Sequence, residues 1–244
     1  MKDIKKQGVY CCMFTITPRL PGENNKEYSY RVIKDGIMSL QLKPGQSISE
    51  VELAEYLKIS RTPIREVMAK LKEENLVEVF PQIGTYVSKI DFQLINEATF
   101  MRYTLEKEIL KQSCLNFSDI SLAELKSMVV MQEALIGQKG MELEFHRLDK
   151  QFHFKIFQEN NMEHVWGAIT RLSTHYNRMR LLSEMENNFA VAVEQHKQII
   201  QMIEEKAVDQ VDQMMKQHII EPKKVWEEFF HSDSPYKDYF YIHQ

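Results

Sequence analysis

The hydrophobic period of this sequence changes twice, and that pattern limits the possible folds more than any other feature. From Glu27 to Asn75 the apolar residues recur with helical spacing, then they alternate in two short runs, and from Asp91 onward helical spacing returns. Spacings of three and four residues place apolar side chains on one helix face, whereas alternation places them on one strand face. The chain is therefore expected to be mainly helical, with one early hairpin.

Three short helices are expected before the hairpin. The first spans about residues 27–40 and ends at the turn Lys43-Pro44-Gly45. The second begins at Ser49-Glu50-Val51-Glu52, which has the spacing of a capping box. The third begins at Ser60-Arg61-Thr62-Pro63, where Ser60 or Thr62 can cap free amides and proline is tolerated in the first turn. Its buried stripe is expected to contain Ile64, Val67, Met68 and Leu71.

The alternating runs cover residues 77–80 and 85–87, with Pro81-Gln82-Ile83-Gly84 between them. Two such runs joined by a turn that contains glycine predict a hairpin. Three short helices followed by a hairpin are typical of a winged helix-turn-helix.

From residue 91 to about 230 every segment with a clear period is helical, which favours an antiparallel helical bundle. The expected breaks lie at Asn116–Asp119, Gly137–Gly140, Asn160–Asn161 and Asn187–Asn188. We therefore expect an N-terminal arm at 1–26, a winged helix-turn-helix at 27–90, an all-helical domain at 91–230 and a C-terminal tail at 231–244. The tail is rich in aromatic residues but has no period.

The charge is distributed unevenly between the two parts. Residues 1–90 carry 14 Lys and Arg against 11 Asp and Glu, or +3, whereas residues 91–244 carry 17 against 24, or −7. This asymmetry suggests that only the first part meets a polyanion.

The cysteines and the apolar runs exclude several classes of protein. Cys11 and Cys12 are adjacent and Cys114 stands alone, so neither a disulfide framework nor a zinc ribbon can be built. No run of about 18 uncharged apolar residues occurs, and the start of the chain lacks the features of a signal peptide. We expect a cytoplasmic protein without a membrane segment.

Arg61 and Arg65 are four residues apart on the third helix, so both project from one face, away from its apolar stripe. The arginine fork suits guanine or phosphate oxygens, and the N-terminal end of a recognition helix enters the major groove. An arginine pair alone is more often a solvated surface pair. The order of turn, capped helix, arginine-bearing helix and wing favours contact with DNA instead.

The segment LKPGQSISEVELAEYLKISRTPIREVMAKLKEENLVEVFPQIGTYVS resembles the DNA-binding domain of GntR-type regulators. That family has a PG turn, an LAE..LGVSRTPVREAL core and a PxxGTFV wing. The resemblance implies that Arg61, Thr62 and Arg65 contact DNA, and that Gly84 at the wing tip lets the backbone approach the minor groove. Val51 and Ile83 stand where many relatives carry a basic residue, so fewer phosphate and wing contacts are expected.

Asp149 and His153 lie four residues apart in FHRLDKQFHFKIF, and His196 and His218 lie beside apolar residues on two later helices. One carboxylate and three imidazoles suit zinc, nickel, iron or manganese better than magnesium or calcium. The alternative is a set of hydrogen-bonded histidines in the core, which spacing alone does not exclude. Because ligating imidazoles must be neutral, affinity for a metal would fall below about pH 6.5.

The pattern D-x-x-F-H, a later histidine helix and a final QHI helix resemble the FCD ligand-binding domain of the FadR-like branch of GntR regulators. The resemblance implies that Asp149, His153, His196 and His218 hold a divalent transition metal such as zinc, nickel or manganese. Arg102 falls on the family's early Arg-x-x-x-Glu helix, one turn before Glu106, and could bind the carboxylate of an effector. An ordinary surface pair between Arg102 and Glu106 explains the spacing equally well.

A metal-dependent enzyme and a dimerising scaffold are the competing functions. An enzyme is disfavoured because neither HExxH nor a glycine-rich phosphate loop occurs. We expect a homodimer on a near-palindromic double-stranded operator, because one short helix reads only a few base pairs. An organic acid is expected to enter the helical domain and to alter the separation of the two DNA-binding heads.

Overall fold

The computed structural model describes residues 14–231 and 233–241 of the 244-residue chain. The chain divides into two compact units, Met1–Ser88 and Lys89–Gln244. The first 13 residues of the expected N-terminal arm, with Cys11 and Cys12, and part of the expected C-terminal tail lie outside the described residues. No described helix is both long and apolar enough to cross a membrane.

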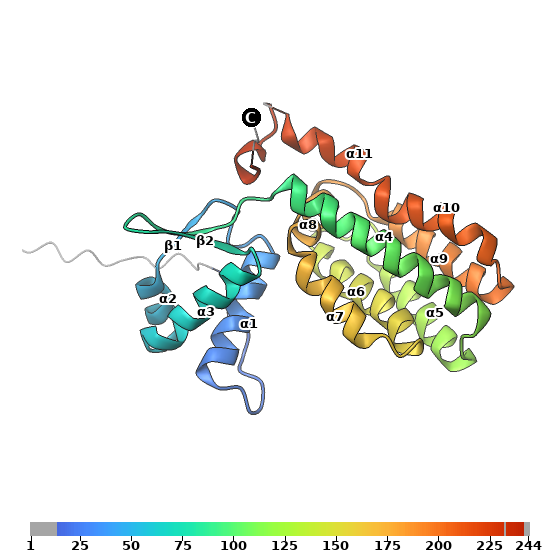
Figure 1. The fold of residues 1–244 in the computed structure, drawn as a ribbon, viewed down its shortest axis with the longest axis horizontal. Coiled ribbons are helices and arrows are strands. Elements are labelled where there is room, and N and C mark those ends of the chain that lie inside the picture. The colour runs from blue at the N-terminus through green and yellow to red at the C-terminus, as the bar shows by residue number, and fades with distance from the viewer. Residues whose placement is uncertain (1–13, 232, 242–244) are drawn as a thin grey trace, which may run out of the picture. The chain divides into compact units, whose positions relative to one another are not determined.

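The N-terminal unit contains three helices and a small antiparallel sheet (Figure 1). Asn24 and Glu27 form a capping box at the start of the first helix, and Ser49 caps the second. Ser60 occupies the cap position of the third helix without a capping side-chain hydrogen bond. The elements are α1 (Asn25–Met38), β1 (Ser47–Ile48), α2 (Glu50–Leu57), α3 (Arg61–Glu73), β2 (Val77–Phe80) and β3 (Gly84–Val87).

The sheet has the order β1-β3-β2. The predicted hairpin is present, with Phe80 opposite Gly84 at its turn. The sequence does not predict β1, because a strand of two residues is too short to show a period. Gly84 has φ +153°, which side-chain-bearing residues rarely adopt, so glycine suits this end of the hairpin.

The core of the N-terminal unit includes the predicted stripe of α3 and also Phe14. The Phe14 ring packs against Gly36 of α1 so closely that a Cβ there would lie 3.0 Å from it. The Phe14 carbonyl oxygen accepts a hydrogen bond from the hydroxyl of Tyr56, at 2.7 Å. The segment from residue 14 onward, expected to be part of an arm, is thus packed against α1 and α2.

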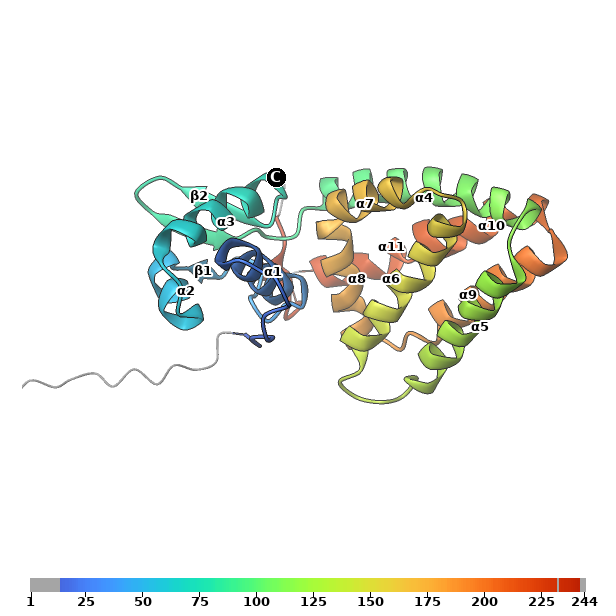
Figure 2. The ribbon, with the colours of Figure 1, turned by 90° about the horizontal axis from the view of Figure 1, so that it is seen from below.

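The second unit is a bundle of helices, which confirms the predicted mainly helical fold with an N-terminal winged helix-turn-helix. α4 contacts α7, α8, α9 and α10, and α5 packs against α6 and α9 (Figure 2). The four expected breaks coincide with the joins between helices. The main helices are α4 (Phe92–Leu115), α5 (Asp119–Ala134), α6 (Glu142–Glu159), α7 (Glu163–Leu172), α8 (Thr174–Glu186), α9 (Ala190–Glu205), α10 (Val211–Met215) and α11 (Lys223–Trp226).

Short irregular helices join or follow the last of these. A π-helical turn, η2 (Lys216–Ile220), directly continues α10. Three 3-10 turns complete the unit: η1 (Val208–Gln210), η3 (Glu227–Phe230) and η4 (Lys237–Tyr239).

The tail returns to the first residues of the second unit. The Ile90 amide donates a hydrogen bond to the Tyr239 carbonyl at 2.7 Å, and the Tyr241 amide donates to the Ile90 carbonyl at 3.1 Å. Phe230 lies between Phe92 and Phe240, with ring centroids 5.0 and 4.2 Å away. The aromatic residues without a sequence period therefore cover the start of α4.

Candidate functional site

The four predicted metal ligands meet inside the second unit. α6 supplies Asp149 and His153 one turn apart, α9 supplies His196, and the π-turn η2 supplies His218. All four side chains are buried, and one ligand atom from each lies within 4.8 Å of the others. Three separate elements therefore converge on one polar centre in an apolar core.

The inner atoms of this cluster are very close together. The Nε2 atoms of His153 and His218 are 3.1 Å apart, and the Nε2 atom of His196 lies 3.3 Å from Oδ1 of Asp149. Within the described part of the chain, the Nε2 atom of His196 is buried without a hydrogen bond. A buried polar atom without a partner costs stability, and each such atom needs an explanation.

The neighbours of the three Nδ1 atoms, which face away from the cluster, help to orient the Nε2 atoms at its centre. The Nδ1 atoms of His153, His196 and His218 lie 2.9, 2.7 and 2.8 Å from side-chain oxygens. Two of these contacts are hydrogen bonds to an amide oxygen, so Nδ1 of His196 and of His218 carries the proton and their Nε2 atoms turn a lone pair toward the centre. Metal-binding histidines are held in this way by their neighbours. The neighbouring oxygens belong to Glu106, Gln132 and Gln195, respectively.

The protonation states also suit a cation. Burial lowers the pKa of His196 to about 4 and the pKa of His218 well below its ordinary value. Burial raises the pKa of Asp149, but the opposing effects, of which the charge of Arg180 is the largest, hold this pKa well below the usual range. Neutral imidazoles and an ionised carboxylate are the ligating forms. A proton at His196 competes with a metal only at a pH lower than the expected 6.5.

Arg180 of α8 is a site residue that the sequence did not reveal. Its two Nη atoms donate to the two oxygens of Asp149, each at 2.6 Å, and its Nε atom lies 2.9 Å from Glu184. The other oxygen of Glu184 lies 3.1 Å from Nδ1 of His146. This network fixes the orientation of the Asp149 carboxylate.

Arg102 pairs with Glu106, at 2.6 Å, and both side chains are buried, so this is not the surface pair that was the alternative to an effector contact. The guanidinium of Arg102 lies over the ring of Tyr176, 4.6 Å from its centroid. Charge from Arg102 and His153 outweighs the desolvation of Glu106 and lowers its pKa to about 2. Arg102 therefore supports the Glu106 carboxylate, which in turn lies against His153.

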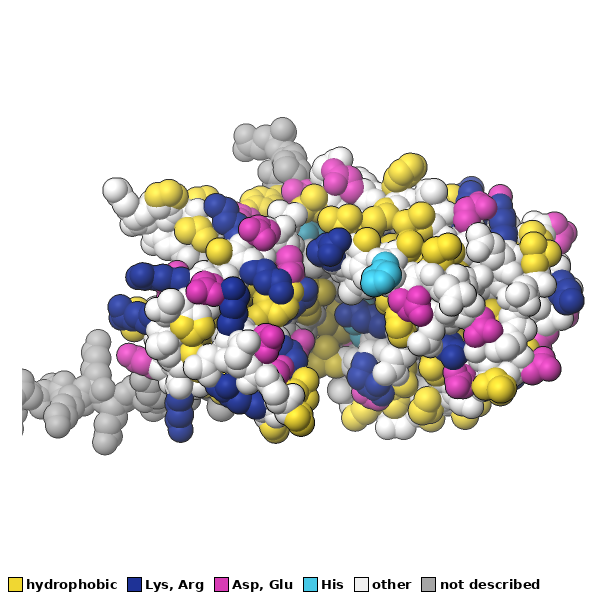
Figure 3. All heavy atoms as spheres, turned by 60° about the horizontal axis from the view of Figure 1, so that its bottom comes forward, with side chains coloured by type: hydrophobic (Ala, Val, Ile, Leu, Met, Phe, Trp, Pro, Cys, Tyr) yellow, Lys and Arg dark blue, Asp and Glu magenta, His cyan; other side chains and the backbone are white. Residues whose placement is uncertain are grey.

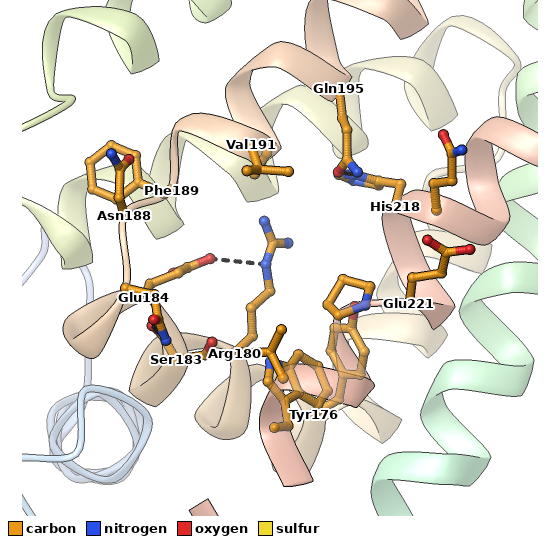
Figure 4. A pocket seen from close by; sticks show the side chains of 16 residues that line it. Tyr176, Arg180, Ser183, Glu184, Asn188, Phe189, Val191, Gln195, His218 and Glu221 are labelled. Atoms are coloured by element: carbon orange, nitrogen blue, oxygen red, sulfur yellow. Dashed lines mark hydrogen bonds and ion pairs between the residues drawn. The ribbon is translucent and has the colours of Figure 1, made fainter. Parts of the chain in front are cut away.

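A cavity of about 400 Å³ opens beside the cluster (Figure 4). His218 and Arg180 form part of its wall, so the cavity borders the cluster on the side of His218, whereas Asp149, His153, His196 and Arg102 are not among the lining residues. This volume is in the range of small-molecule sites, which combine apolar walls with a few polar groups. The other walls include Tyr176, Phe189, Val191 and Trp226 as well as Ser183, Asn188, Gln195 and Glu221.

The predicted DNA-contacting residues lie on the surface of the N-terminal unit. Arg61 and Thr62 are exposed in the first turn of α3, and the side chain of Arg65 is 70% exposed. The Nε atom of Arg65 donates to Glu50 of α2 at 3.0 Å. Figure 3 shows several Lys and Arg side chains projecting from this unit. At the end of the hairpin, Ile83 is 73% exposed next to Gly84.

Two family models match the chain. The model described as "Bacterial regulatory proteins, gntR family" matches residues 27–87, and the FCD domain model matches residues 97–221. A transcriptional regulator from an unstable DNA locus of Streptomyces ambofaciens is 33% identical over 200 residues, which cover 81% of this chain and 83% of the relative. The repressor RspR of Escherichia coli K12 is 26% identical, with 82% of this chain and 88% of the relative covered.

Solved structures show the same fold. McbR/YncC from Escherichia coli superposes with a TM-score of 0.72 at 19% identity, covering 86% of this chain and all of that chain. A GntR regulator from Rhodococcus gives 0.69 at 16% identity, covering 84% and 99%. Both resemblances extend over the two units.

Proposed function

This chain belongs to the gntR family of bacterial transcriptional regulators and carries an FCD effector-binding domain, and from that premise we propose how it recognises DNA and effector. The matched domains and the relatives are those of regulators and not of enzymes. The protein binds a near-palindromic operator as a homodimer in the cytoplasm. A carboxylate effector, bound beside a divalent metal in the helical unit, controls operator affinity.

Recognition of the operator rests on the first turn of α3. Arg61 and Arg65 are exposed on one face, and the backbone amides near Thr62 are placed to hold a phosphate. A bidentate arginine suits guanine in the major groove, while the wing backbone at Gly84 approaches the minor groove. One such helix reads few base pairs, so a second copy is needed to specify an operator.

A surface for the second copy is available on the helical unit. Phe100 of α4 is 74% exposed, Leu172 of α7 is also exposed, and these two helices pack against each other. A Cβ at Gly167 of α7 would meet nothing within 4 Å, so α7 is uncovered at this position. Figure 3 shows hydrophobic side chains gathered on this unit. A two-fold contact through α4 and α7 would remove this apolar surface from water.

The single observation that best supports the metal-dependent effector site is the orientation of the three imidazoles. Nδ1 of His196 and of His218 is hydrogen-bonded to a glutamine oxygen, Nδ1 of His153 lies beside the Glu106 carboxylate, and the three Nε2 atoms lie close to Asp149 or to one another. Zinc, nickel or manganese fits this donor set. A bound ion would supply open coordination positions for a carboxylate oxygen. Arg180 and the second-sphere oxygens keep the ligands oriented whether or not an effector is present.

Control of operator affinity requires that the effector bind the DNA-competent and DNA-incompetent arrangements differently, and the coupling is then reciprocal. The test is selection of binding sites from a randomised duplex library, followed by titration of the selected operator with and without carboxylates. We expect an inverted repeat and an altered operator affinity with at least one carboxylate. A protein with Arg61→Ala and Arg65→Ala is the control and should select nothing. Selection of a single unrepeated site would contradict the dimeric mode of binding.

A further inference from the structure

Glu221 places a carboxylate in the wall of the cavity beside the metal cluster. It follows His218 by three residues, just after η2, and both side chains line the cavity. Figure 4 shows both among the side chains that surround the cavity. Across the residues that the structure describes, the Glu221 carboxylate makes no hydrogen bond and no ion pair, although it is partly buried.

The other charged side chains that line the cavity, Arg180 and Glu184, already form ion pairs with described residues. Arg180 uses both Nη atoms on Asp149 and its Nε atom on Glu184. The second oxygen of Glu184 is held by His146. The guanidinium of Arg180 is therefore directed to Asp149 and Glu184 and forms no ion pair with Glu221 among the described residues. The remaining lining side chains are neutral or are the ligand His218.

The sum of the formal charges at the site restricts the charge that an effector can carry. A divalent ion and Arg180 together balance the three carboxylates of Asp149, Glu184 and Glu221. A simple carboxylate effector would add an uncompensated negative charge to this partly buried site, which is unfavourable unless the charge is paired. A cationic group on the same molecule would restore neutrality.

Two aromatic residues complete this part of the wall. Tyr176 and Trp226 line the cavity and pack edge to face, with ring centroids 5.2 Å apart. The Tyr176 ring already carries the guanidinium of Arg102, and both rings are buried. An ammonium group would therefore be held mainly by an ion pair with Glu221.

From this charge pattern we infer that the effector is dipolar, with a carboxylate directed to the metal and an ammonium group directed to Glu221. The ligand class is that of amino acids and related amino carboxylates, in place of simple organic acids or dicarboxylates. This inference rests on the proposed function, because it assumes that the cavity is the effector site. It adds a specificity residue, Glu221, that neither the family resemblance nor the histidine cluster indicates.

The test is isothermal titration calorimetry on the zinc-loaded full-length protein. The probes are the straight-chain ω-amino carboxylates from glycine to 6-aminohexanoate, the 2-amino carboxylates of the same lengths, and for each the carboxylate without its amino group. Dicarboxylates of similar length complete the set. We expect at least one amino carboxylate to bind about tenfold or more tightly than its counterpart without the amine, as an added buried ion pair should provide.

Glu221→Gln should abolish that preference and leave the affinity for the simple carboxylate unchanged or higher. Glu133→Gln, at an exposed position on α5, is the matched control and should keep the preference. Equal binding of amino and simple carboxylates by the wild type would overturn the inference, as would a preference that survives in Glu221→Gln. Both results would leave the carboxylate site of the proposed function intact. If no carboxylate of either kind binds, the proposed effector site itself is wrong.

Discussion

The Nδ1 atom of His196 lies 2.7 Å from the Oε1 atom of Gln132, and both side chains are completely buried. This contact connects α9 to α5 and fixes which nitrogen of the imidazole faces the metal cluster. Removal of the Gln132 amide should leave the ring free to rotate or to change tautomer. We expect Gln132→Met to weaken zinc binding by roughly 10- to 100-fold.

Competition with a chromophoric chelator measures this change. Gln151→Met is the matched control, because Gln151 is exposed on α6 and should not affect affinity. If both variants bind zinc like the wild type, the Gln132 contact does not orient a ligand.

Metal removal should destabilise the helical unit. The ion would join α6, α9 and η2, so it stabilises the folded unit by mass action, by about 2.7 kcal/mol at a free metal concentration of 100 times Kd. Calorimetry of protein purified without a histidine tag should show a lower Tm after chelation, restored by zinc, nickel or manganese. Elemental analysis should give one ion per chain in the wild type and substoichiometric metal in His196→Ala. Full occupancy in His196→Ala would remove this histidine from the ligand set.

Arg61→Ala and Arg65→Ala should each weaken specific operator binding by roughly 1–3 kcal/mol without a change in Tm. Both side chains are exposed, and the ion pair of Arg65 with Glu50 is a surface pair that adds little stability. Fluorescence anisotropy at fixed salt measures the loss. Arg147→Ala, on the surface of α6, should bind the operator normally. Wild-type affinity in both α3 variants would show that another face reads the bases.

His146 should make stability dependent on pH. Burial lowers the pKa of His146 and outweighs the opposing effect of Glu184, so the ring is neutral in the folded protein. In the unfolded chain it gains a proton below about pH 6.5, so its contribution to stability is present above that pH and decreases as the pH falls through that value. In EDTA, the Tm of the wild type should therefore fall more steeply between pH 7 and 5 than the Tm of His146→Gln. Parallel curves would mean that His146 does not titrate differently in the two states.

Phe100→Glu should convert the dimer to a monomer. A charge at this exposed position of α4 would be placed in the apolar contact that we propose between two copies. Val130→Glu on α5 is the control, because Val130 is 64% exposed on a different helix. Sedimentation velocity should show the wild type and Val130→Glu as dimers. A dimeric Phe100→Glu protein would place the interface elsewhere.

Most of the correct predictions came from sequence patterns within single helices or strands. The apolar stripe of α3 and the alternation of β2 and β3 depend on neighbours within one element, so the helices and the hairpin could be derived from periodicity. Asp149 and His153 share one helical face for the same reason. The distances between His153, His196 and His218 depend on packing between elements, and only the family resemblance grouped these residues in advance.

The residues that orient the metal ligands were missed because they contact those ligands from other helices. Gln132, Arg180 and Gln195 resemble ordinary polar helix residues in the sequence, and their roles appear only when α5, α8 and α9 surround α6. Periodicity also could not show that the Arg102–Glu106 pair is buried, because i,i+4 charge pairs are usual on surfaces. The π-turn that carries His218 has no sequence signature of its own.

The return of the tail to Ile90 has a mechanical consequence. A force applied to the chain at residue 89 does not act on α4 alone. It first loads the two backbone hydrogen bonds between Ile90 and residues 239 and 241, together with the hydrogen bond from the Asp91 amide to Nδ1 of His175, at 2.9 Å. In an experiment that pulls the chain at residue 89, the hydrogen bonds of the aromatic tail would resist the force before α4 does. Its rupture should precede the unravelling of α4 as a separate step, and removal of residues 231–244 should abolish that step.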